Sequence, residues 1–221
     1  MFKKYLSEFI GTSFLIMIVV GSGIMGENLS SGNIALALLA NSLATGFGLF
    51  VLIESFGPIS GAHFNPVVTL LEFLSKKITK KELGFYFIAQ FFGAYLGILL
   101  SHLMFDLSLF QISTKERLGL NLFVSEIVAT IGLLSVIKLV SRHSPHKVAA
   151  AVSCYIASAY WFTSSTSFAN PAVTFARMFT NTFCGIAPNG FVYFVLAQLV
   201  GLIVINLAFS ITPQTLPSDK Q

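Results

Sequence analysis

The chain has 221 residues, of which 55% are hydrophobic and 10% are charged, and its mean hydropathy is +0.81. A soluble domain of this length is rarely so apolar, and several apolar runs reach the roughly 20 residues that a helix needs to cross a bilayer. The composition therefore indicates an integral membrane protein. The net charge of +4 needs no nucleic-acid partner, because basic loops beside a membrane explain it.

Six full-length spans are expected, over about residues 5–25, 33–56, 83–104, 120–140, 147–164 and 191–212. The first of them resembles a signal peptide, because two lysines precede its apolar run. We favour a membrane span, because Ser7-Glu8 in this run recurs as Ser125-Glu126 in the fourth span. The first span thus belongs to a repeated body, and no separate soluble domain is expected.

The two halves of the chain repeat each other. Glu8 and Asn65 in the first half correspond to Glu126 and Asn170 in the second half. We expect a single domain over residues 1–221, with repeat one at about 1–105 and repeat two at about 118–212. Because three spans per repeat is an odd number, the second copy must be inverted relative to the first, as in many transport proteins.

Basic residues predict the orientation of the chain, because cytoplasmic loops hold an excess of Lys and Arg. Most of the Lys and Arg fall on one side if six spans alternate across the membrane. Lys115 and Arg117 fall in a loop on the other side, and Arg177 lies near that loop. Both termini are therefore predicted to be cytoplasmic.

Each repeat contains an Asn-Pro pair followed by a small residue. The two copies are Asn65, Pro66, Val67 and Asn170, Pro171, Ala172. Asn is favoured at the N-cap of a helix and Pro at its first position, so each copy predicts a helix start. About eleven mostly apolar residues follow each Asn, and at ~1.5 Å per residue they cover roughly 16 Å, half the hydrocarbon core. The sequence therefore predicts two re-entrant half-helices, whose lead-ins lie in a protein-lined cavity.

By inversion, the two half-helices enter from opposite sides and their Asn-Pro starts meet near the middle of the membrane. If each Asn side-chain oxygen accepts N–H groups of its own helix start, its NH₂ group is left to donate into the cavity. Both helix N-termini add partial positive charge. A water molecule there turns its oxygen toward two donors, which interrupts proton hopping, and cations meet an electrostatic barrier. The site suits small neutral solutes.

These motifs, the lead-in Ser-Gly-Ala-His, the Glu of spans one and four and the inverted layout resemble the major intrinsic protein family, the aquaporins and aquaglyceroporins. The resemblance covers nearly the whole chain. It implies an all-α membrane protein with six transmembrane helices and two re-entrant half-helices, a homotetramer with one pore in each subunit, passive flux and no cofactor. Residues 165–177 resemble a bacterial branch associated with arsenic resistance, which implies a multi-pass protein of the bacterial plasma membrane.

The chain departs from the family pattern where selectivity is set. Most members carry an Arg three residues after the second Asn, where this chain has Val173. The other filter positions match Thr45, Ser158 and Ser167. Three small hydroxyl residues and one Val predict a wider ring than the aromatic, His and Arg ring of water-selective members. Arg177 is one turn beyond Val173, roughly 6 Å further out, and is expected at the outer mouth.

The sequence thus favours a passive channel for glycerol-like polyols, metalloid acids such as arsenite, and water, which excludes protons and ions. One alternative is a water-selective aquaporin in which Arg177 folds back to complete the filter. A secondary transporter also uses inverted repeats and broken helices, but it normally needs ionisable groups at the two Asn-Pro motifs, and the sequence offers none. An enzyme is not expected, since no Ser/His or His/Asp/Glu pair accompanies the motifs.

Three further residues are candidates for a functional role. Glu8 and Glu126 suggest proton coupling, but carboxylates at matching sites beside long lead-ins more often accept the backbone N–H bonds that support those loops. His63 precedes the first Asn-Pro pair, and lining of the inner pore and packing of the loop are equally compatible with that position. A metal site is not expected, because the other histidines share no ligand spacing with His63.

Overall fold

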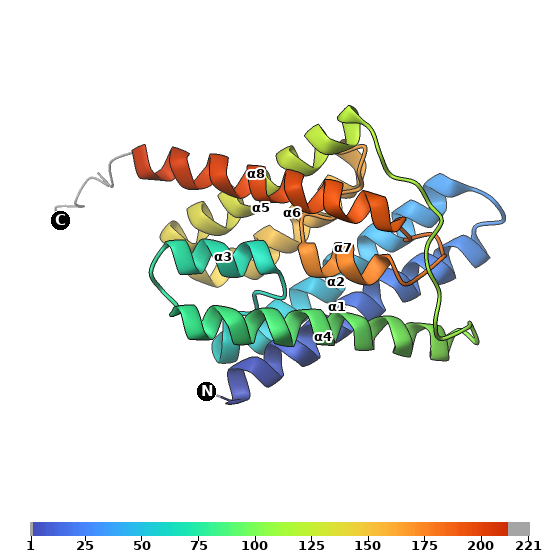
Figure 1. Ribbon diagram of the computed structural model, residues 1–221, viewed down its shortest axis with the longest axis horizontal. Helices are drawn as coiled ribbons and strands as arrows, with labels where there is room; N and C mark the ends of the chain where they lie inside the picture. Colours follow the sequence, from blue (N-terminus) through green and yellow to red (C-terminus); the bar gives the residue numbers. More distant parts are fainter. Residues whose placement is uncertain (1, 212–221) are drawn as a thin grey trace.

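The computed structural model describes residues 2–211, and its regular secondary structure within that range consists of helices, with no strand (Figure 1). The helices are α1 (Phe2–Leu29), α2 (Ile34–Ser60), α3 (Pro66–Leu74), α4 (Lys80–Met104), α5 (Leu120–His143), the 3-10 helix η1 (Pro145–Lys147), α6 (Val148–Phe162), α7 (Pro171–Arg177) and α8 (Pro188–Ile211). The first half has two long helices, a short one and another long one, and the second half repeats this order with a shorter second helix, α6. This is the order that the repeat in the sequence predicts.

Within the described residues, five helices are long and apolar enough to cross a membrane, namely α1, α2, α4, α5 and α8. The expected fifth span is shorter than predicted. Its helix α6 has 15 residues, which cover roughly 22 Å, and the single turn of η1 precedes it. The helix ends at Phe162 because Thr163 is already in an extended conformation, as the first residue of the lead-in to α7.

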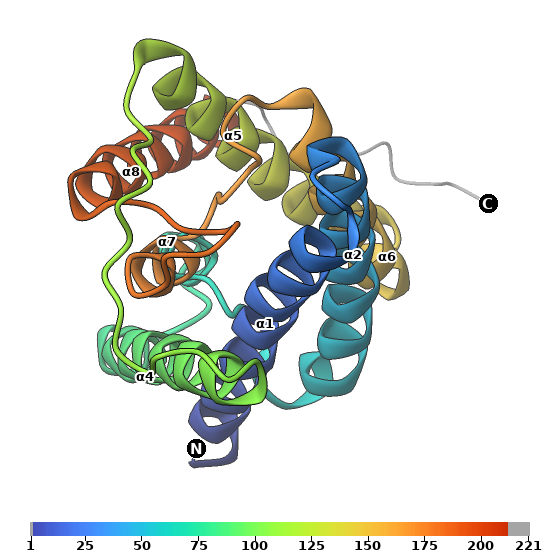
Figure 2. The same ribbon diagram turned by 90° about the vertical axis from the view of Figure 1, so that its right-hand side faces the viewer.

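The two short helices α3 and α7 lie between α4 and α8 and pack on both of them (Figure 2). The long helices α1 and α2 pack on each other, as α5 does on α6 and α8, and α2 also packs on α6. Figure 1 shows that α3 and α7 point in opposite directions, with their N-terminal ends facing each other. The long helices therefore hold two half-length helices end to end in the interior.

Glycine allows the closest of these helix contacts. A Cβ atom on Gly93 of α4 would lie 2.3 Å from the carbonyl oxygen of Phe9 in α1, and one on Gly97 would lie 2.5 Å from that of Ser13. Small residues of this kind let helix backbones approach each other in membrane proteins. The α1–α4 pair is therefore packed backbone against backbone.

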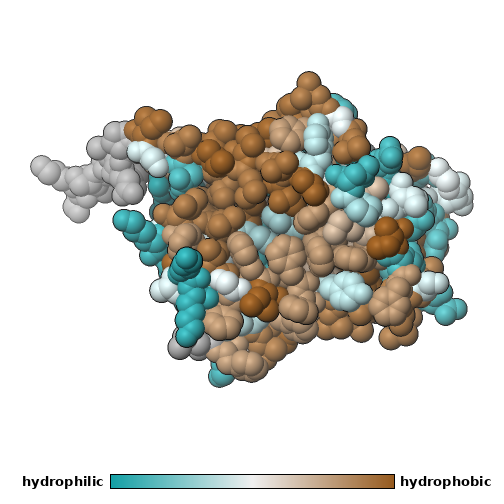
Figure 3. All heavy atoms as spheres, viewed as in Figure 1, coloured by the Kyte–Doolittle hydropathy of each residue, from teal (hydrophilic) through white to brown (hydrophobic). Residues whose placement is uncertain are grey.

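The outer surface is apolar over the middle of the molecule. Large hydrophobic side chains of the long helices are exposed there, including Phe47 at 71% and Phe92 at 67%. Figure 3 shows hydrophobic residues over the central part of one face and hydrophilic residues gathered mainly toward its two ends. An apolar surface of this extent fits contact with lipid, as the composition predicts.

Candidate functional site

The helices α3 and α7 begin at the same place in the molecule. The side-chain oxygen of Asn65 accepts the backbone N–H of Val67 at 3.0 Å, and that of Asn170 accepts the N–H of Ala172 at 2.9 Å. A proline follows each Asn at the first helical position, where its missing N–H costs no hydrogen bond. Both helix starts are thus capped in the way that the Asn-Pro pairs predict.

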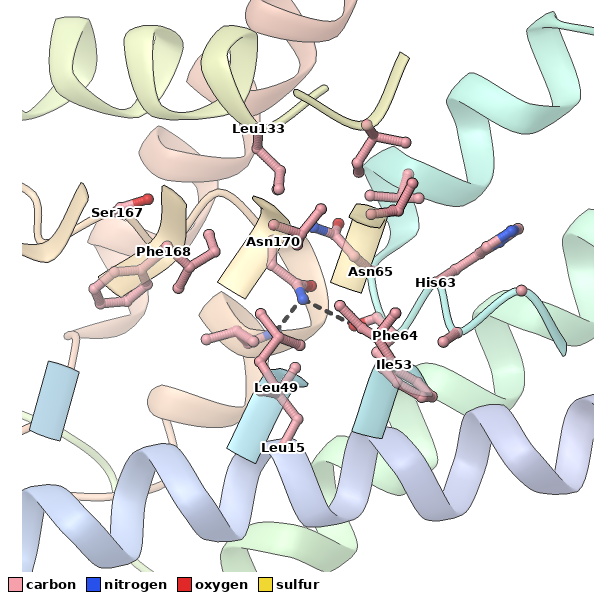
Figure 4. A pocket seen from close by; sticks show the side chains of 18 of the residues that line it. Leu15, Leu49, Ile53, His63, Phe64, Asn65, Leu133, Ser167, Phe168 and Asn170 are labelled. Carbon is pink, nitrogen blue, oxygen red and sulfur yellow. Dashed lines mark hydrogen bonds between the residues drawn. The ribbon is translucent and has the colours of Figure 1, made fainter. Parts of the chain in front are cut away.

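The two caps are also joined to each other. The Nδ2 atom of Asn65 donates to the carbonyl oxygen of Ala169 at 2.8 Å. Nδ2 of Asn170 donates to that of Phe64 at 2.8 Å, as Figure 4 shows. The expectation that each NH₂ group is wholly available to the cavity therefore needs correction. One N–H of each amide holds the opposite repeat, and the other N–H remains as a donor.

The lead-ins to the two half-helices have the same backbone shape. Residues four, three and one before each Asn have positive φ, namely Gly61 (88°), Ala62 (49°) and Phe64 (47°) in the first repeat, and Thr166 (61°), Ser167 (49°) and Ala169 (45°) in the second. Five of these six residues carry a Cβ atom, and the left-handed conformation costs each of them roughly 1–2 kcal/mol. Such a conformation persists only where the surrounding structure fixes it.

A buried carboxylate fixes the first lead-in. Glu8 of α1 accepts the backbone N–H groups of His63 at 2.9 Å and Phe64 at 2.8 Å, and it also accepts the Ser60 hydroxyl at 2.7 Å and the Gln90 amide at 2.8 Å. These four donors occupy both carboxylate oxygens of Glu8. Glu8 is fully buried behind the lead-in and does not line the cavity described below.

Glu126 of α5 has the same place in the second repeat. It accepts the backbone N–H groups of Phe168 and Ala169, both at 2.9 Å, and the Gln198 amide at 2.7 Å. Gln198 donates onward to the hydroxyl of Thr174 at 3.0 Å. The two glutamates therefore support the two lead-ins, and neither one reaches the cavity, where a proton-coupling group would need to lie.

A cavity of about 270 Å³ runs past both asparagines. Glu72, Lys77 and Ser141 line one end of it, and Val173 and Arg177 line the other. One wall is apolar and comes from the long helices, with Leu15, Val19, Leu49, Ile53, Leu133, Ile137, Val152 and Ile156. Figure 4 shows leucine side chains of this wall, Leu15, Leu49 and Leu133, around Asn65 and Asn170. The cavity thus pairs a polar wall from the lead-ins with an apolar wall opposite.

Two of the four expected filter residues line this cavity. Ser167 is 3% exposed and its hydroxyl has no hydrogen-bond partner within residues 2–211, and Val173 lies beside it on the cavity wall. Thr45 is buried on the same face of α2 as Leu49, one turn away, with its hydroxyl 3.3 Å from that of Tyr160. It does not line the cavity itself.

Ser158 lies in a different place from the one expected. It is exposed on the outside of α6, and its hydroxyl donates to the carbonyl oxygen of Cys154 in its own helix. The cavity face of α6 carries Val152, Ile156 and Tyr160, which follow one another at intervals of four residues. Ser158 is two residues from Tyr160, about 200° around the helix, and therefore points away. Tyr160 was not among the residues predicted from the sequence, although this four-residue period indicates it.

Arg177 is buried, at 3% exposed, and lines the cavity near its outer end. Its Nε donates to the carbonyl oxygen of Cys184, and its guanidinium lies 3.4 Å from the centre of the Phe168 ring. Arg117 lies over the same ring at 5.2 Å. Burial and the nearby charge of Arg177 lower the pKa of Arg117 to about 10, which leaves it protonated at neutral pH. Arg177 is therefore held in the cavity wall and is not a solvated side chain at the mouth.

His63 lines the cavity on the side of Glu72 and Lys77. Its Nδ1 lies 3.1 Å from the hydroxyl of Thr69, and its ring packs on Tyr86 with 4.8 Å between centroids. His63 therefore both lines the inner part of the cavity and packs within the lead-in, so the two roles that the sequence left open occur together. The described part of the chain contains no group of three His, Cys, Asp or Glu that could hold a metal ion.

Known proteins are similar to this chain in sequence and in fold. A sequence model of the family described as Major intrinsic protein matches residues 1–152. The chain is 48% identical over 201 residues to the aquaglyceroporin AqpS of Rhizobium meliloti (strain 1021), and this alignment covers 91% of this chain and 86% of that protein. It is 36% identical to aquaporin TIP1-2 of Musa acuminata over 60% of this chain and 54% of that protein. The solved aquaglyceroporin structure of Plasmodium falciparum is 22% identical, covers 96% of both chains and gives a TM-score of 0.72. The predicted aquaporin-like, all-α fold is confirmed.

Proposed function

Because the chain belongs to the major intrinsic protein family, we propose that it is a passive channel for small uncharged solutes: glycerol-like polyols, metalloid acids such as arsenite, and water. The observation that carries this proposal is the cavity that passes both Asn-Pro helix starts. Among its described lining residues the only carboxylate is Glu72, which pairs with Lys77 at 2.9 Å at the inner end. The charged lining residues, Glu72 and Lys77 at the inner end and Arg177 near the outer end, thus leave the stretch beside the asparagines neutral.

The polar wall offers a solute both donors and acceptors. Asn65 and Asn170 each keep one amide N–H that no residue of the described chain accepts. Residues 61–63, 167 and 168 line the cavity, and their carbonyl oxygens accept no hydrogen bond within residues 2–211. A polyol or an undissociated metalloid acid carries hydroxyl groups that exchange water for these partners, while its carbon or metalloid centre faces the apolar wall.

Ions and protons are excluded by the same arrangement. The N-terminal ends of α3 and α7 meet at the asparagines and bring partial positive charge there. A water molecule that accepts hydrogen bonds from both asparagines must donate its own hydrogens toward the two ends of the cavity. The hydrogen-bonded chain of waters therefore reverses its direction at that point, and a proton cannot hop along it. The apolar wall gives a dehydrated ion no replacement for its lost water.

The outer filter sets the size limit. It consists of Ser167, Val173 and Tyr160, with Arg177 held against Phe168, and Thr45 lies behind it with its hydroxyl 3.3 Å from that of Tyr160. This combination has an apolar side and a hydroxyl-and-guanidinium side, which suits a polyol better than a row of single waters. The second candidate is a water-selective channel, and it is favoured by one observation, the position of Arg177 in the cavity wall.

Membrane setting and assembly follow from the sequence and the family. The expected placement is the bacterial plasma membrane, with both termini in the cytoplasm, since most basic residues fall on the side of the N-terminus. The family implies a homotetramer with one pore in each subunit. It also implies a transport protein rather than an enzyme.

Stopped-flow measurements on proteoliposomes test this function. We expect glycerol and arsenite permeabilities above those of protein-free vesicles, linear in solute concentration and unaffected by a proton or sodium gradient. Permeabilities equal to those of the empty vesicles would refute the channel, and saturable flux driven by a gradient would indicate a transporter. Replacing Arg177 with Ala separates the two channel candidates: a large gain in glycerol flux supports the water-selective filter, whereas little change supports the wide ring.

A further inference from the structure

A second cavity lies beside the inner end of the channel cavity. It has a volume of about 690 Å³ and is formed where the C-terminal ends of α3, α5 and α8 come together. We call it the basic groove, and define it by Lys77, Lys138, Arg142, Asn206 and Phe209, which line it. Neither of the two asparagines lines this groove.

Within residues 2–211, the groove carries more positive charge than its one carboxylate, Glu72, neutralises. Lys138 and Arg142 are one turn apart on α5, and both lie over the ring of Phe209, at 5.0 Å and 4.9 Å. Within residues 2–211 neither one forms an ion pair with a carboxylate, whereas Lys77 is paired with Glu72. Lys138 is also half-buried, so its charge is partly removed from water. Two adjacent cations in such a place are stabilised by a bound anion.

The groove lies at the boundary between the apolar surface and the polar end of the molecule. The helices α3, α5 and α8 end together at the left of Figure 1, the same end at which the chain begins. Figure 3 shows hydrophilic residues at this end next to the hydrophobic surface. One turn before the ends of their helices, Leu139 of α5 and Leu207 of α8 are exposed and apolar. Phosphate groups of lipids lie at this depth, with acyl chains beside such residues.

We propose that the basic groove binds the headgroup of an anionic phospholipid. The phosphodiester lies between Lys138 and Arg142, where both cations reach its oxygens. The side-chain amide of Asn206, which makes no hydrogen bond within the described residues, binds the alcohol of the headgroup. The acyl chains extend along Leu139 and Leu207. Basic pockets between membrane helices recognise acidic lipid headgroups by this chemistry.

The groove also shares residues with the channel. Glu72, Lys77, Ile137 and Ser141 line both cavities. A bound headgroup therefore contacts the walls of the inner end of the channel and holds α3 against α5 and α8. We expect the lipid to stabilise the folded subunit, because a ligand that binds only the folded state raises its stability.

Native mass spectrometry of the detergent-solubilised protein tests the site, with phosphatidylglycerol as the probe and phosphatidylcholine as the neutral reference. Each basic residue near an anionic lipid contributes about fivefold in binding. The variant Lys138→Gln/Arg142→Gln should therefore bind the first phosphatidylglycerol roughly 25-fold more weakly, with phosphatidylcholine binding unchanged. The matched control is Lys80→Gln/Lys81→Gln, which removes two exposed cations outside the groove and should bind as the unchanged protein does.

Several outcomes would overturn this inference. Equal loss of binding in the groove variant and the control would mean a diffuse electrostatic effect, and no loss in the groove variant would place the lipid elsewhere. Displacement of the lipid by equimolar inorganic phosphate would indicate a site for a free anion. If the double variant fails to fold, the two single variants are measured instead. In addition, phosphatidylglycerol should raise the unfolding temperature of the unchanged protein more than phosphatidylcholine does. The absence of this difference would refute the proposal.

Discussion

Replacing Glu126 with Gln tests whether a buried carboxylate holds the second lead-in. The carboxylate accepts the Phe168 N–H on one oxygen and the Ala169 N–H and the Gln198 amide on the other. A Gln side chain has one oxygen, so its NH₂ group must face at least one of these donors. If the oxygen faces Ala169 and Gln198, the Phe168 N–H is left unsatisfied in a fully buried site.

The size of the effect follows from these three bonds. An unsatisfied buried donor costs about 1–3 kcal/mol, and the two remaining bonds lose the extra strength that a charged acceptor gives, so the total is about 2–5 kcal/mol. This is a large part of the 5–15 kcal/mol by which proteins are typically stable. We also expect a fall in glycerol flux per folded molecule, because Ala169, whose N–H is bound by Glu126, accepts the amide of Asn65 through its carbonyl oxygen.

The first assay is thermal unfolding in detergent, with the folded fraction monitored by size-exclusion chromatography. The second is stopped-flow glycerol permeability, measured at equal amounts of folded protein. Glu54→Gln is the matched control, because Glu54 is exposed on α2 and makes no hydrogen bond or ion pair within residues 2–211. Equal unfolding temperatures for Glu126→Gln and Glu54→Gln would show that the carboxylate does not hold the lead-in. An unchanged flux in a destabilised variant would refute only the link to Asn65.

Three further tests, one with a single substitution and two with a matched pair, have definite expected outcomes. Asn65→Asp replaces the amide donors with a carboxylate that cannot donate to the Ala169 carbonyl oxygen, so cation leak should rise in electrophysiology, and an unchanged leak would contradict the proposed barrier. Ser158→Phe should leave water and glycerol permeability unchanged because this side chain points outward, whereas Tyr160→Ala should increase glycerol permeability severalfold; a block by the first would restore Ser158 to the filter. Gly93→Ala should lower the unfolding temperature because its Cβ meets a carbonyl oxygen of α1 at 2.3 Å, while Gly84→Ala, with open space around it, should not; equal effects would refute the packing argument.

The half-helices could be predicted from the sequence because their signals are local. An Asn followed by Pro determines a cap and a first turn within three residues, so Asn65 and Asn170 predict the starts of α3 and α7 without knowledge of the rest of the fold. The glutamates were predictable for a second reason. Glu8 and Glu126 stand at equivalent places in an internal repeat, and the structure gives them equivalent partners.

The outer part of the site was harder to predict because it depends on contacts between distant segments. The face of α6 is set by where that helix begins, and an offset of two residues separates Ser158 from Tyr160. The position of Arg177 depends on the Cys184 carbonyl oxygen and the Phe168 ring, which belong to irregular segments on either side of α7. No local pattern determines the paths of those segments. Sequence spacing therefore predicts that Arg177 is near the outer end but not that it is buried.

The reciprocal bonds between the two asparagines and the opposite lead-ins have a consequence for biosynthesis. Asn65 depends on the carbonyl oxygen of Ala169, which is made 104 residues later, and Asn170 depends on that of Phe64. While the first repeat leaves the ribosome, its half-helix has no partner to hold its cap. The centre of the conduit is therefore complete only when both repeats are in place, because each repeat supplies an acceptor to the asparagine of the other.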